Sequence, residues 1–245
     1  MSADCLRIAM WSGPRNMSTT MMRSFGARED TACVDEPFYA AYLKATGLDH
    51  PMAREIFDAQ STNPIEIIAD LTCPSEQDPA IFYQKHMTHH MVPDLPRHWM
   101  ADCRNVFLIR HPARVIASYA RKMDKVTLGA IGFRQQLSVF EFAAEIEEDV
   151  PLVIDSDDIL RDPEGMLHAL CDALGIVWDP AMLSWSSGPK PEDGAWAPHW
   201  YDAVWRSTGF GPAPGALPEV SEGLMETYEA ALEIYDALAA YRLEA

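Results

Sequence analysis

The chain has 245 residues, of which 48% are hydrophobic and 23% charged, and this composition excludes a fibrous or a disordered protein. Its 37 acidic residues outnumber its 19 basic residues, so the formal net charge is −18. That charge excludes a general nucleic-acid binder, because such proteins gain most of their affinity from Lys and Arg side chains that neutralise phosphates. A small anionic ligand is compatible with it, since local arginines and backbone N–H groups can build a positive pocket.

The five cysteines are scattered and form no C-x-x-C pair. An odd number of cysteines without zinc-type spacing predicts reduced thiols and a cytoplasmic protein. No apolar run approaches the ~20 residues that span a bilayer, and the N-terminus has no basic-then-apolar leader pattern. We therefore expect a cytoplasmic protein with no membrane partner and no nucleic-acid partner. The sequence carries no signal for an oligomeric state.

Short apolar runs alternate with helical patterns along the first half of the chain. Residues 6–11 form an apolar run suited to a buried strand, and 18–27 are expected to form the helix that follows. A second apolar run, ending in a carboxylate and a helical pattern, occupies 33–43. One or two helices are expected at 52–71, and another strand at 80–86.

The same alternation continues in the second half, which predicts a parallel α/β sheet covered by helices on both faces. We expect a P-loop-like, three-layer α/β fold with a central parallel sheet of about four to five strands. The chain, 1–245, is expected to form a single domain, with a long loop rich in Gly, Pro and Trp at about 184–217. The other expected elements are a strand at 105–111, a helix from Pro112, a helix at 140–149, a strand at 151–159, a helix from Pro163 to Gly175, and a C-terminal helix at about 219–242.

The stretch MWSGPRNMSTTMMRSF, residues 10–25, has the strand, tight turn and helix layout of a phosphate cradle. The loop of ATP-binding proteins reads G-x-x-x-x-G-K-[ST]. In the same frame this chain has Gly13, then Ser18 in place of the second Gly and Thr19 in place of the Lys. The first N–H groups of the helix, its adjacent hydroxyl residues and Arg15 favour a phosphate or a sulfate group.

A local role explains the loop equally well, with Ser18 as an N-cap residue and Arg15 on the surface. A second group of residues favours a ligand site. Arg110 stands at the end of the strand expected at 105–111, and Ser118 lies two helical turns into the next helix. Because ligands bind at the carboxyl ends of the strands in open α/β sheets, Arg110 is placed where a ligand is expected.

With these two motifs the chain resembles the sulfotransferases that use 3′-phosphoadenosine 5′-phosphosulfate (PAPS). SGPRNMSTT resembles the family's loop for the 5′-phosphosulfate, with Arg15 where the commoner members have Lys. LIRHPARVIASY resembles its motif for the 3′-phosphate. The resemblance covers about residues 6–200, and the segments similar to three further family elements are YQKHMTHHMVPDLP, DSDDILRDPEGMLHALCDALGI and, more loosely, GPKPEDGAWAPHW.

The resemblance implies an enzyme that moves a sulfuryl group from PAPS to a hydroxyl or an amine of a small-molecule acceptor and releases 3′-phosphoadenosine 5′-phosphate. It implies in-line transfer without a metal, in which most of the catalysis is positioning and charge stabilisation. Arg15 is expected to stabilise charge on the leaving phosphate. The residues implied to bind the cofactor are Gly13, Pro14, Arg15, Asn16, Met17, Ser18, Thr19, Thr20, Arg110, Ser118, Lys190, Gly194 and Trp196.

The acceptor also needs a general base, for which the sequence offers several candidates. The resemblance implies catalytic roles for Lys85 and His86, although the family spacing is Lys-x-His and these two residues are adjacent. His89 and His90 are near enough in sequence to substitute. Glu36, in VDEPF, resembles the acidic base of other branches of the superfamily. Histidine suits the task because its ordinary pKa is ~6.5, whereas a glutamate needs desolvation to raise its pKa.

Other interpretations stay open. Glu36 can be an N-cap, Asp155 at the end of PLVID is expected to be structural, and a cluster of tryptophans either lines an acceptor pocket or packs the long loop. A P-loop kinase or nucleotide hydrolase shares the strand–loop–helix layout but predicts a loop Lys and Mg²⁺ dependence. A catalytically idle nucleotide- or anion-binding protein of the same fold predicts binding without transfer. The tryptophans are Trp185, Trp196, Trp200 and Trp205.

Overall fold

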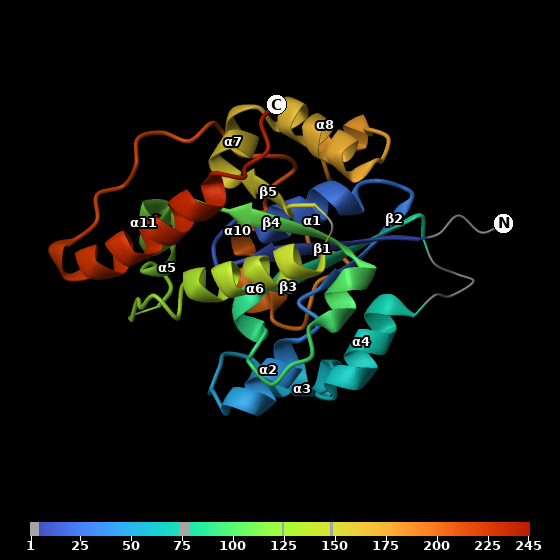
Figure 1. Ribbon diagram of the computed structural model, residues 1–245, viewed down its shortest axis with the longest axis horizontal. Helices are drawn as coiled ribbons and strands as arrows, with labels where there is room; N and C mark the ends of the chain where they lie inside the picture. The colour runs from blue at the N-terminus through green and yellow to red at the C-terminus, as the bar shows by residue number, and fades with distance from the viewer. Residues whose placement is uncertain (1–4, 74–78, 124, 148) are drawn as a thin grey trace.

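The centre of the molecule is a sheet of parallel strands, seen in a computed structural model that describes residues 5–73, 79–123, 125–147 and 149–245 (Figure 1). The strands are β1 (Leu6–Ser12), β2 (Thr31–Asp35), β3 (Ile81–Met87), β4 (Arg104–Ile109) and β5 (Leu152–Asp155). In space they follow the order β2-β3-β1-β4-β5, and every neighbouring pair is parallel. In this register Trp11 of β1 lies between His86 of β3 and Phe107 of β4.

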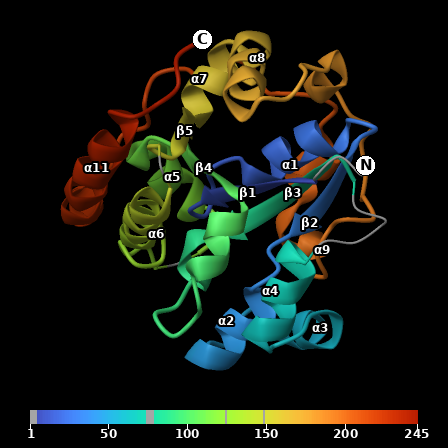
Figure 2. The same ribbon diagram turned by 45° about the vertical axis from the view of Figure 1, so that its right-hand side comes forward.

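Helices cover both faces of the sheet (Figure 2). Because side chains alternate along a strand, β1 feeds two separate apolar clusters. Ile8 and Met10 belong to the cluster that includes residues of α1 and α8, whereas Ala9 and Trp11 belong to the cluster with residues of α4, α6 and α11. The helices are α1 (Ser18–Gly26), α2 (Tyr39–Thr46), α3 (Ala53–Ala59), α4 (Pro64–Thr72), α5 (Pro112–Tyr119), α6 (Phe133–Ile146), α7 (Ser156–Arg161), α8 (Pro163–Leu174), α9 (Ala197–Trp200), α10 (Asp202–Trp205) and α11 (Met225–Ala239).

The strand order creates a switch point between β1 and β4. The chain leaves β1 through α1 toward β2 on one side of the sheet, and it leaves β4 through α5 and α6 toward β5 on the other side. Connections that diverge from adjacent strands open a crevice at the carboxyl ends, and this is where open α/β sheets bind ligands. The loop after β1 and Arg110 after β4 flank this crevice.

The predicted three-layer α/β fold with a parallel sheet is confirmed, with local differences. The strand expected at 151–159 ends at Asp155, because the Asp155 carboxylate accepts a hydrogen bond from the backbone N–H of Asp157 (2.6 Å) and thereby caps α7. The segment expected as a loop at 184–217 contains the short helices α9 and α10, and the last helix begins at Met225. None of the described helices combines the length and the apolar character needed to cross a membrane.

Candidate active site

Buried polar contacts hold the loop after β1 in an unusual backbone conformation. Arg15 and Met17 have φ angles of 68° and 67°, in the left-handed region. Asn16 is 1% exposed, and its Nδ2 donates to the Leu108 carbonyl at 3.2 Å. The Asn16 carbonyl accepts from the Ser156 hydroxyl at 3.0 Å. Non-glycine residues usually avoid the left-handed region, so this conformation needs contacts that stabilise it. The hydrogen bonds of Asn16 supply them and hold the loop beside the crevice between β1 and β4.

The first turn of α1 opens onto this crevice. Met17 occupies the N-cap position, and within the described part of the chain no side chain caps the helix. Ser18, Thr19 and Thr20, the first residues of α1, line a cavity. The free N–H groups at a helix start, together with the positive end of the helix dipole, favour an anion.

Three of the predicted cofactor ligands contact one another. Arg15 donates from Nε to the Ser118 hydroxyl (3.0 Å), and Arg110 donates from Nη1 to the Arg15 carbonyl (2.8 Å). The Nε of Arg110 is buried and has no hydrogen-bond partner among the described residues. Burial lowers the pKa of both guanidinium groups, which indicates positive charge that a bound anion would compensate. We call these three residues and the start of α1 the anion cradle.

The cavity that contains the anion cradle has a volume of about 660 Å³, which is within the usual range of small-molecule sites. Glu36 and Lys85 line the same cavity as Arg15 and Arg110. Much of the remaining lining is aromatic or apolar, which suits the body of an organic ligand. We call this part the aromatic wall, and it consists of Tyr39, Tyr42, Leu48, Met87, Tyr119, Met123, Trp196, Trp200, Tyr201 and Val204.

A buried cluster of charges surrounds Lys85, which is 1% exposed. Its Nζ donates to Asp35 Oδ1 (2.7 Å), to Glu36 Oε1 (2.6 Å) and to the Tyr201 hydroxyl (2.7 Å). Burial alone would lower the pKa of Lys85, but the Asp35 and Glu36 carboxylates raise it well above its ordinary value, so the amine stays charged. Burial raises the pKa of Glu36 to about 7, against the lowering influence of Lys85.

Comparison with known proteins agrees with this geometry. The family model described as "Sulfotransferase domain" matches residues 6–242. The chain belongs to this sulfotransferase family. Two Arabidopsis thaliana proteins, branched-chain-amino-acid aminotransferase-like proteins 1 and 2, are 38% identical over 203 residues and 35% identical over 212 residues. These matches cover 83% and 86% of this chain but 36% and 37% of the plant proteins, so the chain spans little more than a third of their length.

Two solved sulfotransferase domains share the fold. The domain from the Synechococcus PCC 7002 olefin synthase superposes with a TM-score of 0.52 at 20% identity, covering 98% of this chain and 96% of that chain. The domain from the curacin biosynthetic pathway superposes with a TM-score of 0.53 at 14% identity, covering 100% of this chain and 94% of that chain. At these identities the likeness concerns the fold.

The structure does not bring His86 to the cavity of this sulfotransferase. Its ring stacks on Trp11, with ring centroids 4.4 Å apart, and its Nε2 contacts Gln84 Oε1 at 3.1 Å. Burial lowers the pKa of His86 to about 3. Adjacent residues of a strand point to opposite faces, so Lys85 can line the cavity only while His86 enters the core. This placement argues against the predicted catalytic role of His86.

His89 and His90 do line the cavity. His90 Nε2 is 3.9 Å from Glu36 Oε2, and His89 Nδ1 is buried without a hydrogen-bond partner among the described residues. Burial lowers the pKa of His89 to about 3 and that of His90 well below its ordinary value. Both rings are therefore neutral near pH 7, and their lowered pKa values make them weak bases.

The long segment after residue 184 contributes unequally to the predicted cofactor set. Trp196 lines the cavity, but neither Lys190 nor Gly194 does. Lys190 instead donates to the Ser186 hydroxyl, and the Gly194 N–H donates to Asp35 Oδ2 at 3.2 Å. Gly13 also lies outside the lining, at the start of the loop, where an added Cβ would be 2.9 Å from the Ile131 carbonyl oxygen. None of these three residues lines the cavity.

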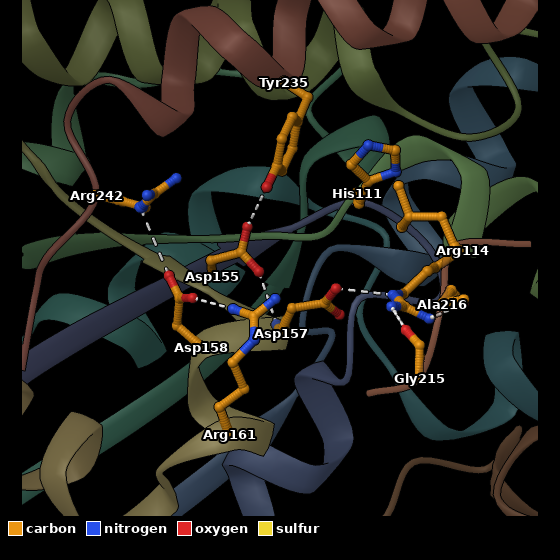
Figure 3. Close-up of a pocket in the computed structure, with 11 residues that line it drawn as sticks. His111, Arg114, Asp155, Asp157, Asp158, Arg161, Gly215, Ala216, Tyr235 and Arg242 are labelled. Atoms are coloured by element: carbon orange, nitrogen blue, oxygen red, sulfur yellow. Dashed lines mark hydrogen bonds and ion pairs between the residues drawn. The ribbon is translucent and has the colours of Figure 1, made fainter. Parts of the chain in front are cut away.

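A second cavity, of about 400 Å³, lies beside α7 and is drawn in Figure 3. Arg114 is paired with Asp157 (2.7 Å) and Arg242 with Asp158 (3.6 Å), and Arg161 also pairs with Asp158. This internal neutralisation gives the second cavity no net attraction for an anion, in contrast to the anion cradle.

Asp155 accepts from the Tyr235 hydroxyl (2.6 Å) as well as capping α7, which agrees with the structural role expected for it. Over the described residues, no group of three or more His, Cys, Asp or Glu side chains is arranged to hold a metal ion.

Two residues of the charge cluster, Asp35 and Tyr201, were not predicted as site residues from the sequence. Asp35 immediately precedes Glu36 at the end of β2. This pair of adjacent carboxylates at a strand end is the sequence feature that could have indicated Asp35. Tyr201 lies 166 residues from Asp35 in the chain and carries no recognisable motif. Only the folded structure brings its hydroxyl to the sulfotransferase site.

Proposed function

We propose that this sulfotransferase moves a sulfuryl group from PAPS to a hydroxyl or an amine of a small-molecule acceptor, by in-line transfer without a metal. The observation that carries the proposal is that one cavity of about 660 Å³ contains both the anion cradle and Glu36. The cradle offers positive charge to an anionic donor, and Glu36, whose pKa is about 7, can take a proton from an acceptor. A transfer reaction needs both groups in one place.

The residues of the anion cradle fit the donor. The buried, unpaired Nε of Arg110 and the uncapped start of α1 provide hydrogen-bond donors at two points. By the family resemblance, the start of α1 and Arg15 would hold the 5′-phosphosulfate, and Arg110 and Ser118 the 3′-phosphate. When bound, PAPS supplies the sulfuryl group, whose bond to the 5′-phosphate breaks as a bond to the acceptor forms, leaving 3′-phosphoadenosine 5′-phosphate.

Glu36 is the base in this proposal. Lys85 holds its Oε1, which leaves Oε2 to accept the proton of the acceptor hydroxyl. His89 is the rival base in the cavity, but its pKa of about 3 makes it a poor proton acceptor near neutral pH. The Arg15 guanidinium opposes the charge that develops on the leaving phosphate, and the aromatic wall lines the same cavity beside Glu36.

Titration calorimetry with 3′-phosphoadenosine 5′-phosphate, beside ATP with Mg²⁺, tests the donor assignment. Tight binding of the first and none of the second supports the proposal, and the reverse result would support a P-loop kinase or hydrolase instead. Transfer from labelled PAPS to a panel of alcohols, phenols and amines then tests catalysis. Binding of the product nucleotide without transfer to any acceptor would show the catalytically idle protein of the same fold.

A further inference from the structure

Asp35, the last residue of β2, is 3% exposed and accepts three hydrogen bonds, one from β3 and two from the long segment after residue 184. Its Oδ1 accepts from Lys85 Nζ at 2.7 Å. Its Oδ2 accepts from the Tyr201 hydroxyl at 2.7 Å and from the Gly194 N–H at 3.2 Å. One carboxylate therefore joins β3 to the segment that supplies Trp196 and Tyr201 to the aromatic wall.

Lys85 stands between two carboxylates at nearly equal distances. Its Nζ is 2.7 Å from Asp35 Oδ1 and 2.6 Å from Glu36 Oε1, so a single positive charge is shared by two negative groups. The buried position strengthens each of these interactions, because the low-dielectric interior screens charges less than water does. If Asp35 were neutral, Lys85 would act on Glu36 alone and hold it as the carboxylate.

We propose that Asp35 is a positioning residue for sulfuryl transfer: it divides the charge of Lys85 so that Glu36 can accept a proton, and it fastens the aromatic wall beside that base. The inference rests on the proposed function, because it takes Glu36 as the base. Asp35 does not itself line the cavity, so it acts through Lys85 and Tyr201.

The histidine and tyrosine side chains next to the charge cluster are neutral at pH 7. His90, from the 3₁₀ turn at Thr88–His90, is uncharged because burial lowers its pKa. Burial raises the pKa of Tyr39 of α2 and of Tyr201, so both phenols keep their protons. The charges that act on Glu36 from β2 and β3 are therefore those of Asp35 and Lys85.

The direction of the effect follows from the signs of these charges. Asp35 raises the pKa of Glu36 by repulsion, and Lys85 lowers it by attraction. Replacing Asp35 with a neutral residue removes its repulsion of the Glu36 carboxylate. The Lys85 ammonium group then attracts Glu36 alone, so the pKa of Glu36 falls. A lower pKa makes Glu36 a weaker base at neutral pH, and it moves the acid limb of the rate profile to lower pH.

The test is an NMR titration of carbon-13-labelled glutamate carboxyl groups, with 3′-phosphoadenosine 5′-phosphate bound and the Glu36 signal assigned by its loss in Glu36→Gln. In Asp35→Asn we expect the Glu36 midpoint to fall by about one pH unit or more, the usual size of a close charge effect. The acid limb of kcat/KM for transfer should shift by the same amount. An unchanged midpoint in Asp35→Asn would overturn the inference.

Asp193→Asn is the matched control, because Asp193 anchors the same segment without contacting Lys85. It accepts from Arg23 Nη2 at 2.5 Å and from Trp205 Nε1 at 2.9 Å. Loosening the segment alone should leave the Glu36 midpoint where it is in the parent. An equal shift in Asp193→Asn would assign the effect to packing and also overturn the inference.

The outcomes separate this inference from the proposed function. Loss of transfer in Glu36→Gln with an unmoved midpoint in Asp35→Asn refutes only the inference. Full transfer activity in Glu36→Gln refutes the base assignment itself, whatever the titration of Asp35→Asn shows. Should Asp35→Asn fail to fold, Asp35→Ser removes the same charge with a smaller side chain, and the same downward shift is expected.

Discussion

Arg110 Nη1 donates to the backbone carbonyl of Arg15 at 2.8 Å, so the arginine that follows β4 holds the loop that follows β1. Arg15 in turn reaches Ser118 of α5 through its Nε at 3.0 Å. The residues assigned by resemblance to the 3′-phosphate thus touch the residue assigned to the leaving phosphate. The two ends of the anion cradle are therefore linked by direct hydrogen bonds.

Arg110→Ala should weaken the binding of 3′-phosphoadenosine 5′-phosphate by ~1.5–3 kcal/mol, the range for a hydrogen bond to a charged group. The substitution removes the unpaired Nε and also the contact that holds the Arg15 carbonyl. Titration calorimetry measures the change. Arg134→Ala, at an exposed position of α6, is the control and should bind like the parent. Parent-like binding by Arg110→Ala would show that the 3′-phosphate site is misassigned.

Glu36→Gln should lower kcat for transfer by about 10²–10⁴-fold, the usual contribution of a general base. Binding of 3′-phosphoadenosine 5′-phosphate should stay within about threefold of the parent, because Glu36 is assigned to the acceptor and not to the donor. Turnover with labelled PAPS, beside calorimetry on the same preparation, separates the two effects. If transfer survives in Glu36→Gln and disappears in His89→Ala, then His89 is the base.

The activity should rise with pH through about 7. Burial raises the pKa of Glu36 to about 7, and only the deprotonated carboxylate can accept a proton, so the base form gains population as the pH increases through that value. The profile of kcat/KM from about pH 5 to about pH 9 measures this limb in the free enzyme. A limb centred near the ordinary glutamate pKa would contradict the desolvated state of Glu36.

The parts of the site that were predictable are those encoded by neighbours in the chain. Gly13 to Thr20 and Arg110 to Ser118 each follow a strand and lead into a helix, so their place at the carboxyl ends of strands was predictable from the sequence, and the family resemblance implied their roles. The fold followed from the same alternation of apolar runs and helical patterns. Within the charge cluster, Lys85 and Glu36 were candidates from the sequence, but Tyr201 was not predictable, because it lies 116 residues from Lys85 and is placed by tertiary packing.

The preference for His86 as the base failed to use the periodicity of the strand. Lys85 and His86 both lie in β3, where successive side chains point to opposite faces. The presence of Lys85 among the cavity residues therefore requires His86 to point into the core, beside Trp11 and Phe38. The family resemblance and the ordinary pKa of histidine both suggested His86, but burial lowers its pKa to about 3 and so removes its suitability as a base near neutral pH.

His86 should contribute to stability rather than to turnover. Its pKa falls from the ordinary value of 6.5 to about 3 in the folded protein, so its stabilising contribution is complete above about pH 6.5 and is lost as the pH falls toward 3. The free energy of unfolding of the parent should therefore fall when the pH is lowered from 7 to 5, because His86 becomes charged in the unfolded state. In His86→Phe this fall should be smaller by about 2 kcal/mol. Urea unfolding at both pH values measures the difference. Parallel losses in parent and variant would show that His86 is not a buried neutral ring.

Gly13→Ala should destabilise the protein and weaken nucleotide binding together. The added Cβ would be 2.9 Å from the Ile131 carbonyl oxygen, a backbone atom that cannot rotate away, so the loop or residue 131 must shift. Such overpacking destabilises a folded protein by about 1–3 kcal/mol, and a displaced loop can no longer hold Arg15 against Ser118.

Gly223→Ala is the control, because a Cβ at that exposed position meets no heavy atom within 4 Å among the described residues. Thermal unfolding with and without 3′-phosphoadenosine 5′-phosphate reports both effects. If Gly13→Ala keeps the stability and the ligand-induced shift of the parent, the close approach of residues 13 and 131 does not constrain the anion cradle.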